Sequence, residues 1–388
     1  MIQMVSLGDI CDIKIGRTPP RKQPQWFSES HGIKWVSIKD MGNTGKYISQ
    51  TSEFLTADAI KKFNIPIIPA GTLLMSFKLT VGRLGFTEYD MCSNEAIAQL
   101  PIKDPDMVDK NYLYYYLKNF NFGSLSSTSS IATAVNSKTV KNISVNLPPL
   151  DRQKKIANIL GSLDEKIELN RRMNETLEQL GQALFRHYFV DNPEAKNWES
   201  GRVSDVVRIY SGFAFKSKDF DINGKYGLVT IKNVQDGSFI KDCTDYLSEP
   251  PPDKTPEYVH LKSGDIILSL TGNVGRVCIV VGRDYLLNQR VAKLVSDESQ
   301  AYTYFLFRSK IMKGRMVGIS KGTAQKNLSS IETGKLKIKI PPTNIMSQFE
   351  EIAINLLNMI VSNNEQSQTL TNLRDSLLPK LISGDIKV

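Results

Sequence analysis

The chain has 388 residues, of which 41% are hydrophobic and 23% are charged, and its net charge is +9. This composition excludes intrinsic disorder and collagen-like architecture, and the length allows two domains with their own cores. No apolar run approaches the roughly 20 residues of a membrane-spanning helix, and Asp9, Asp12 and Lys14 stand where a signal peptide needs apolar residues. We therefore expect a cytoplasmic protein.

The cysteines and histidines do not form a metal-binding pattern. Cys11, Cys92, Cys243 and Cys278 make no Cys-x-x-Cys pair, and the chain has only three histidines. Zinc sites need four such ligands at short, characteristic spacings. We expect reduced and mostly buried thiols, with no metal and no cofactor.

The positive charge lies in two long segments. Residues 1–150 carry +4 and residues 195–342 carry +8, whereas residues 151–194 carry −1 and residues 343–388 carry −2. Asp and Glu are absent from residues 110–150 and 299–331. The second of these stretches holds Arg308, Lys310, Lys313, Arg315, Lys321 and Lys326. Two acid-free stretches at equivalent places predict two surfaces that face a polyanion such as DNA or RNA.

The two basic segments belong to a tandem repeat with an offset of about 193 residues. The aligned pairs are Val36–Met41 with Val229–Val234, Gly71–Ser76 with Gly264–Ser269, Gly82-Arg83 with Gly275-Arg276, and Pro148-Pro149 with Pro341-Pro342. The unit is far longer than a solenoid repeat. Each copy is therefore expected to be a domain with an appendage.

The first copy begins with a domain, residues 1–150. Short apolar runs bounded by turn residues predict strands at Trp35–Ile38 and Leu73–Phe77, and a helix is expected at Tyr112–Asn119. Glycines beside Arg83 allow either a close approach to a phosphate or a tight hairpin at positive φ, and the sequence leaves both open.

A long helix follows within residues 151–194, because two prolines end the preceding strand and the apolar period changes to three and four residues. Its expected seam, the stripe of residues that would face a partner helix, includes Leu160, Leu163, Ile167 and Leu177. The spacing between Asn170 and Met173 is one residue shorter than the alternation of three and four residues requires, and is here called the short step.

The second copy repeats this order. Residues 195–342 form the second domain, with strands expected at Gly227–Ile231, Ile266–Leu270 and Val277–Val281 and a helix at Ala301–Lys313. The second long helix lies within residues 343–388. Its expected seam includes Leu356, Met359, Leu370 and Leu373, with polar residues at mid-length that set register. The predicted fold class is α+β, with two similar, mainly antiparallel β domains.

We expect the two long helices to pair as an antiparallel coiled coil. Each lacks a second partner in its own repeat, and only antiparallel pairing lets the short link Val190–Trp198 lead into the second domain. A helix of about 35 residues spans roughly 50 Å, on the order of 15 base pairs of duplex. Two related domains would then contact two half-sites at a fixed spacing.

Two helical segments resemble a known family. Leu163–Gln179 and Ala183–Asp191 resemble the central conserved region of the DNA-specificity subunits of type I restriction-modification systems, and Leu373–Ile386 resembles their C-terminal conserved region. In the second copy, Ser211–Lys216 and Gly322–Asn327 match the family's loop motifs. The first copy departs from these motifs at Ile15–Pro19 and Ile131–Asn136.

The resemblance implies a non-catalytic subunit that binds double-stranded DNA through two target-recognition domains. It also implies two modification subunits, which bind S-adenosylmethionine and methylate adenine, on the helical spacer. Restriction subunits would join them for ATP-dependent cleavage.

Motifs for catalysis by the chain itself are absent. Asn146–Leu150 and Ile340–Thr343 lack the polar residue and the aromatic that flank the prolines of an adenine methyltransferase loop. A nuclease motif assembled from Pro105-Asp106 and Asp164–Lys166 would place its second half on the amphipathic helix. No P-loop occurs.

Basic and amide side chains in the two copies are the candidate DNA contacts, and Arg17 and Gln325 are the candidates for reading bases. The full set is Arg17, Lys39, Lys78, Arg83, Lys138, Lys216, Lys232, Arg276, Lys321, Thr323, Gln325 and Lys326.

Two alternatives remain. The chain could be the separate recognition half of a self-contained restriction-methylation enzyme, or a two-domain scaffold that binds only protein. The acid-free stretches argue against the scaffold, and the missing catalytic motifs argue against any enzyme.

Overall fold

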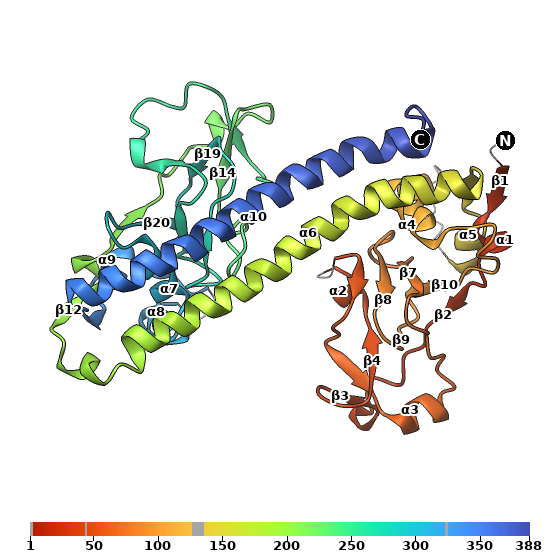
Figure 1. The fold of residues 1–388 in the computed structure, drawn as a ribbon, viewed down its shortest axis with the longest axis horizontal. Helices are drawn as coiled ribbons and strands as arrows, with labels where there is room; N and C mark the ends of the chain where they lie inside the picture. The colour runs from red at the N-terminus through yellow and green to blue at the C-terminus, as the bar shows by residue number, and fades with distance from the viewer. Residues whose placement is uncertain (1–2, 43–44, 126–135, 323–324) are drawn as a thin grey trace. The chain divides into compact units, whose positions relative to one another are not determined.

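The computed structural model describes residues 3–42, 45–125, 136–322 and 325–388. It divides into two compact units, here called unit 1 (residues 1–168 and 369–388) and unit 2 (residues 169–368). Each unit therefore contains one β-rich domain and a part of each of two long helices (Figure 1). None of the helices in the described ranges combines the length and the apolarity that crossing a membrane requires.

The long helices are α6 (Leu150–Phe185) and α10 (Thr343–Ser383). Each begins directly after a Pro-Pro pair, as the change of period predicts. Proline has no N–H to donate, and the first turn of a helix does not need one, so Pro149 and Pro342 end the strand segments without cost to the helices.

Unit 1 is built from two sheets and a two-stranded ribbon. The strand orders are β2-β10-β7-β8-β5, β3-β6-β4-β9 and β1-β11. The strands are β1 (Gln3–Ser6), β2 (Lys14–Ile15), β3 (Phe27–Ser28), β4 (Ile33–Val36), β5 (Tyr47–Ile48), β6 (Glu53–Leu55), β7 (Leu73–Ser76), β8 (Leu84–Thr87), β9 (Cys92–Ser93), β10 (Ile97–Leu100) and β11 (Ser144–Leu147). The short helices are α1 (Leu7–Ile10), α2 (Ile38–Met41), α3 (Ala57–Lys62), α4 (Lys110–Asn119) and α5 (Ser137–Lys141).

Unit 2 repeats this plan, with strand orders β13-β20-β17-β18, β15-β14-β19-β16 and β12-β21. The strands are β12 (Ser200–Arg202), β13 (Arg208–Ser211), β14 (Tyr226–Val229), β15 (Tyr246–Leu247), β16 (His260–Leu261), β17 (Ile266–Ser269), β18 (Val277–Ile279), β19 (Tyr285–Leu287), β20 (Val291–Val295) and β21 (Lys337–Lys339). The short helices are α7 (Gln300–Arg308), α8 (Lys310–Ile319) and α9 (Ser330–Gly334).

The shared topology confirms the tandem repeat and the α+β class. Strands β7 and β8 correspond to β17 and β18 at the offset of 193 residues, and β10 corresponds to β20. Most strand pairs are antiparallel, but each unit also has the same parallel pair, β4 with β9 and β14 with β19.

Several predicted elements need correction. The strands expected over Gly227–Ile231 and Val277–Val281 end at Val229 and Ile279. The strand expected to reach Ile38 ends at Val36, because the Ser37 side chain accepts the Asp40 N–H and caps α2. The helix expected over Ala301–Lys313 is two helices. Ser309 adopts an extended conformation and its side chain accepts the Met312 N–H, so it ends α7 and caps α8.

Helices α6 and α10 run antiparallel, as predicted, and contacts within each unit show it. In unit 1 the early residue Asp164 of α6 pairs with the late residue Arg374 of α10 at 2.6 Å. In unit 2 the ring of Phe185, the last residue of α6, lies 6.1 Å from that of Phe349 in the second turn of α10.

Polar side chains form one layer of the helix pair in unit 2. Asn170 is fully buried, and its amide donates to the Gln366 side chain at 2.9 Å and to the Asn363 carbonyl at 3.3 Å. Asn174 donates to Asn364 and accepts from Asn363, both at 2.9 Å. Asn170 and Asn363 stand 193 residues apart, so equivalent positions of the repeat meet here. The polar residues predicted at mid-length of α10 are thus present in the contact between the two helices.

The seam itself differs from the predicted one. Leu160 is buried, and Leu163, Ile167 and Leu177 are half-buried. The seam continues through Asn174 instead of Met173, so the short step is wrong and the spacing stays regular. On α10, Met359 and Leu373 are each 45% exposed and lie outside the seam. The buried positions are one residue further along, at Ala353, Leu357, Ile360 and Leu378, and Leu356 and Leu370 are half-buried beside them.

The cysteines are free thiols, as expected. Cys11, Cys92 and Cys278 are buried and Cys243 is half-buried. Burial raises the pKa of the Cys11, Cys92 and Cys278 thiols to about 12.

Candidate nucleic-acid interface

In unit 1 the structure brings Lys39 and Arg83 together. Lys39 is exposed on α2, and the Arg83 guanidinium, which precedes β8, donates to the Ile38 carbonyl at 2.7 Å. Arg83 also lies close against Gly42, where an added Cβ would come within 2.4 Å of it. Arg83 is therefore fixed against the backbone of the helix that carries Lys39, and these two residues are here called the cationic cluster of unit 1.

Unit 2 holds the equivalent pair, Lys232 and Arg276, through Gln235. The Gln235 side chain accepts from the Arg276 guanidinium and donates to the Lys232 carbonyl at 3.1 Å. Lys232 is exposed and Arg276 is half-buried. Since both pairs sit at the repeat offset, the two units present the same cationic cluster by different hydrogen bonds.

The turn before Arg276 docks on the segment that carries Lys321, Gln325 and Lys326. The Gly272 N–H donates to the Lys326 carbonyl at 2.9 Å, and the Thr271 hydroxyl donates to the Asn327 side chain at 3.0 Å. Lys321, Gln325 and Lys326 are all exposed. Hydrogen bonds thus connect three segments of unit 2 that carry candidate residues. Residues 232–236 and 271–276 are linked through Gln235, and residues 271–276 are linked to Lys326 and Asn327 of the third segment.

The glycines in these turns have a structural explanation. Gly272 and Gly275 have φ of +73° and +80°, and Gly82 has φ of +90°. Their N–H groups donate to the Lys326, Ser269 and Ser76 carbonyls. The amides are therefore used within the protein, which favours the tight-turn interpretation over a phosphate cradle.

Arg17 stands apart from the Lys39 cluster in its contacts. Its guanidinium donates to the Phe63 and Asn64 carbonyls at 3.0 and 2.9 Å, and so closes the turn after α3. A guanidinium has five N–H groups, so Arg17 keeps donors for a base, but its described contacts are structural.

The remaining candidates are separate exposed side chains. Lys78 lies in the β7–β8 turn over the Phe77 ring, Lys138 lies in the first turn of α5, and Lys216 follows the buried Phe215. Thr323 and residues 131–135 of the first-copy loop motif lie outside the described residues.

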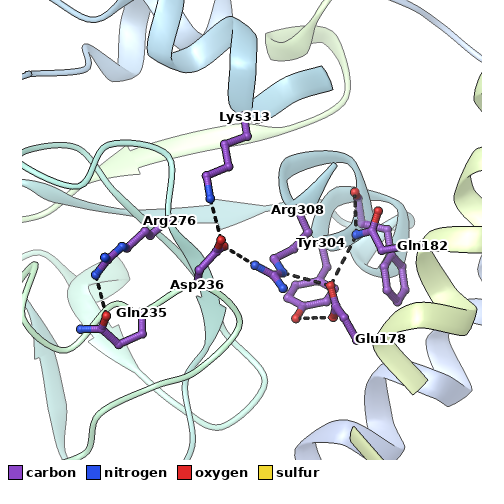
Figure 2. A network of polar contacts seen from close by, with 9 residues as sticks. Glu178, Gln182, Gln235, Asp236, Arg276, Tyr304, Arg308 and Lys313 are labelled. Carbon is purple, nitrogen blue, oxygen red and sulfur yellow. Dashed lines mark hydrogen bonds and ion pairs between the residues drawn. The ribbon is translucent and has the colours of Figure 1, made fainter. Parts of the chain in front are cut away.

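Part of the acid-free stretch is neutralised from elsewhere in the chain (Figure 2). Arg308 donates to Glu178 of α6 at 3.0 Å and to Asp236, and Lys313 donates to Asp236 at 2.6 Å. Burial lowers the pKa of Arg308, but the negative charge of Glu178 offsets this and raises the pKa overall. Arg308 is therefore neutralised by ion pairs within the protein, although the sequence groups it with Lys321 and Lys326.

Sequence reasoning missed Glu178, Gln235 and Asp236. Glu178 lies 130 residues from Arg308 and Gln235 lies 41 residues from Arg276, so no local pattern connects them. One sequence feature could have pointed to Gln235 and Asp236: both closely follow Lys232, in a loop equivalent to the one after Lys39.

Metal ligands do not gather in the described part of the chain, where no group of three or more His, Cys, Asp or Glu side chains is placed to hold an ion.

The fold defines the class: a chain of two similar α+β domains with two long paired helices. A family model described as the type I restriction modification DNA specificity domain matches the chain twice, at residues 2–179 and 195–372. The chain therefore belongs to this family. Specificity subunits are the non-catalytic components of type I systems, so the chain is not itself an enzyme.

Known relatives extend over nearly the whole chain. The MjaIX specificity subunit of Methanocaldococcus jannaschii is 27% identical over 98% of this chain and 93% of its own length. The EcoBI specificity subunit of Escherichia coli is 21% identical over 94% of this chain and 82% of its own. The crystal structure of a type I S subunit from M. genitalium has the same fold, with a TM-score of 0.58, 16% identity and coverage of 98% and 96%.

We predict that Arg276, Lys321 and Lys326 contact DNA phosphates. Replacing each by Ala should weaken duplex binding and lower the slope of log affinity against log salt by about one per lost contact. Binding titrations at several salt concentrations measure this slope. Lys225→Ala is the control, because Lys225 already pairs with Glu249 at 2.6 Å. An unchanged slope in all three variants would remove these residues from the interface.

Proposed function

We propose that this chain recognises a bipartite double-stranded DNA target, with one half-site bound by each unit and the spacing set by the α6–α10 pair. One observation carries the proposal. Each unit contains a domain of the same topology with the same cationic cluster at the repeat offset, Lys39 with Arg83 and Lys232 with Arg276. Two related but non-identical faces suit two different half-sites.

The two faces differ in the residues that read bases. The Gly322–Asn327 segment of unit 2 carries Gln325, whose amide can make two hydrogen bonds to the major-groove edge of adenine, donating to N7 and accepting from the N6 amino group. Unit 1 has no Gln in the matching loop sequence. Different side chains on one backbone plan would give two unrelated half-site sequences. The phosphate contacts would position both domains without specifying sequence.

Selection from a random DNA library tests this function. The full chain should enrich duplexes with two short conserved blocks separated by an unconserved spacer, and Gln325→Ala should relax one block only. A single uninterrupted block, or no enrichment, would contradict the proposal. Methylation of DNA by the chain alone would instead favour the self-contained enzyme, and protein binding without DNA binding would favour the scaffold.

We further propose that two methyltransferase subunits dock on the helices, one at each unit, and that restriction subunits join this complex in the cytoplasm. Ile159 and Ile352 are 37% and 45% exposed, and Leu180 and Leu373 are 47% and 45% exposed. Both pairs are related by the offset of 193 residues. Unit 1 thus exposes Ile159 and Leu373, and unit 2 exposes Leu180 and Ile352.

These exposed residues predict how many methyltransferase subunits bind one copy of this chain. Large apolar side chains at equivalent helix positions in both units favour two equivalent docking faces. In co-purification with the methyltransferase, Leu180→Glu with Ile352→Glu should remove one of two methyltransferase copies, because a buried unpaired carboxylate is costly. Native mass spectrometry counts the copies. Asn358→Glu, at an exposed position on α10, is the control, and two retained copies in the double variant would contradict the prediction.

A further inference from the structure

A chain of ion pairs in unit 2 links helix α6 to the loop that holds Arg276. It begins at Glu178, which accepts from the Tyr304 hydroxyl at 2.8 Å and from the Arg308 guanidinium at 3.0 Å. The side chains of Glu178 and Arg308 are only 20% and 15% exposed, so water screens this pair weakly. Figure 2 shows Arg308 between Glu178 on one side and Asp236 on the other.

Close packing fixes the first link. At Gly181, one turn after Glu178, an added Cβ would lie 2.0 Å from the Phe305 ring, so α7 approaches α6 closely there. Gln182 also donates to the Phe305 carbonyl at 3.4 Å. Tyr304 and Arg308 are therefore carried on a helix whose position against α6 is set by direct contact.

The second link reaches the loop, residues 232–237. Arg308 bonds Asp236, and it also lies against Gly237, where an added Cβ would come within 2.7 Å of the guanidinium. Gly237 has φ of +84° and its N–H donates to the Val277 carbonyl at 2.8 Å. One residue before Asp236, the Gln235 side chain accepts from the Arg276 guanidinium. The orientation of Arg276 thus depends on a loop that Arg308 holds.

We propose that Glu178 and Asp236 are positioning residues for DNA binding by unit 2. Through Arg308 they hold the loop 232–237, and through Gln235 they hold Arg276 in the orientation that contacts DNA. The inference rests on the proposed function, because it assumes that Arg276 faces the duplex. It extends that function by making a residue of the helical spacer part of the apparatus that positions a DNA contact.

Unit 1 has a related arrangement, in which the arginine comes from α10 and not from a helix of the domain. Asp164 of α6 accepts from the Tyr115 hydroxyl of α4 at 2.6 Å and pairs with Arg374. In both units, therefore, a tyrosine of the domain's own helix and an arginine converge on one acidic residue of α6.

A pure charge effect and a positioning role predict opposite changes in DNA affinity when either carboxylate is removed. Asp236 and Glu178 are negative groups beside a surface proposed to bind a polyanion. If only net charge mattered, removing either charge would strengthen DNA binding. If they position Arg276, removing either would weaken it, because the binding-competent loop conformation would be less populated.

The test compares Asp236→Asn with Asp297→Asn in the full chain, using the duplex that the unmodified chain enriches from a random library. Both changes remove one charge from a solvent-accessible aspartate that pairs with arginine, Arg308 for Asp236 and Arg208 for Asp297. If the loop is competent in about a tenth of the Asp236→Asn molecules, affinity falls about tenfold. Asp297→Asn should bind as tightly as the unmodified chain or more tightly.

The route through Arg276 is tested by combining variants. Arg276→Ala should weaken binding, and Asp236→Asn should add little further loss in the Arg276→Ala background, because contacting groups are not additive. Glu178→Gln should behave like Asp236→Asn. The Asp236 side chain is 44% exposed, so its variant tests the inference even where Glu178→Gln lowers stability.

Unchanged or tighter binding by Asp236→Asn, with Arg276→Ala weakened, would overturn the positioning role and leave the proposed interface standing. If the losses of binding free energy in the two single variants added up in the double variant, Asp236 would not act through Arg276. An Arg276→Ala variant that binds normally would overturn the interface at this residue and the inference together.

Discussion

The antiparallel pairing of α6 and α10 is the interaction on which the rest of the structure depends. In unit 1 the core includes Leu160 of α6 and Leu378 of α10, and in unit 2 it includes Phe185 and Phe349 of the same two helices. Neither domain core is complete without residues from both helices. The pairing therefore makes each unit from parts of both repeat copies, and one linear chain becomes two related recognition modules.

Polar and charged groups in the helix pair serve register more than stability. In the Asn170–Asn363 layer, hydrogen bonds of the side-chain amides replace apolar packing, and they can form in one alignment of the helices only. Such polar layers specify the register of a helix pair at a cost in stability. Asp164 and Glu178 add a second constraint, because each binds a tyrosine from the domain beside it. Within each unit, α6 thus bonds both its partner helix and the domain beside it.

The sequence predicted what is periodic or repeated and missed what depends on packing between distant segments. The Pro-Pro pairs and the offset of 193 residues located both long helices, since proline and apolar period act locally. The predicted seam of α10 holds at Asn363 and Gln366, which bond α6, but Met359 is exposed. Leu357 is buried instead, because it packs in the core of the unit 2 domain, and the apolar period alone does not show which residues that domain covers. Arg308 belongs to the acid-free stretch, but its partners Glu178 and Asp236 are far away in the chain, so no local pattern shows that it is neutralised.

The most direct test of the spacer is to lengthen both helices where the units meet in sequence, by inserting one heptad after Glu168 in α6 and one after Gln368 in α10. These sites leave the contacts inside each unit intact, and seven residues preserve the helix faces while adding about 10 Å. Selection from a library with random spacers should then yield the same two half-sites with a spacer longer by about three base pairs. Retention of the original spacer at full affinity would show that the helices do not set the distance.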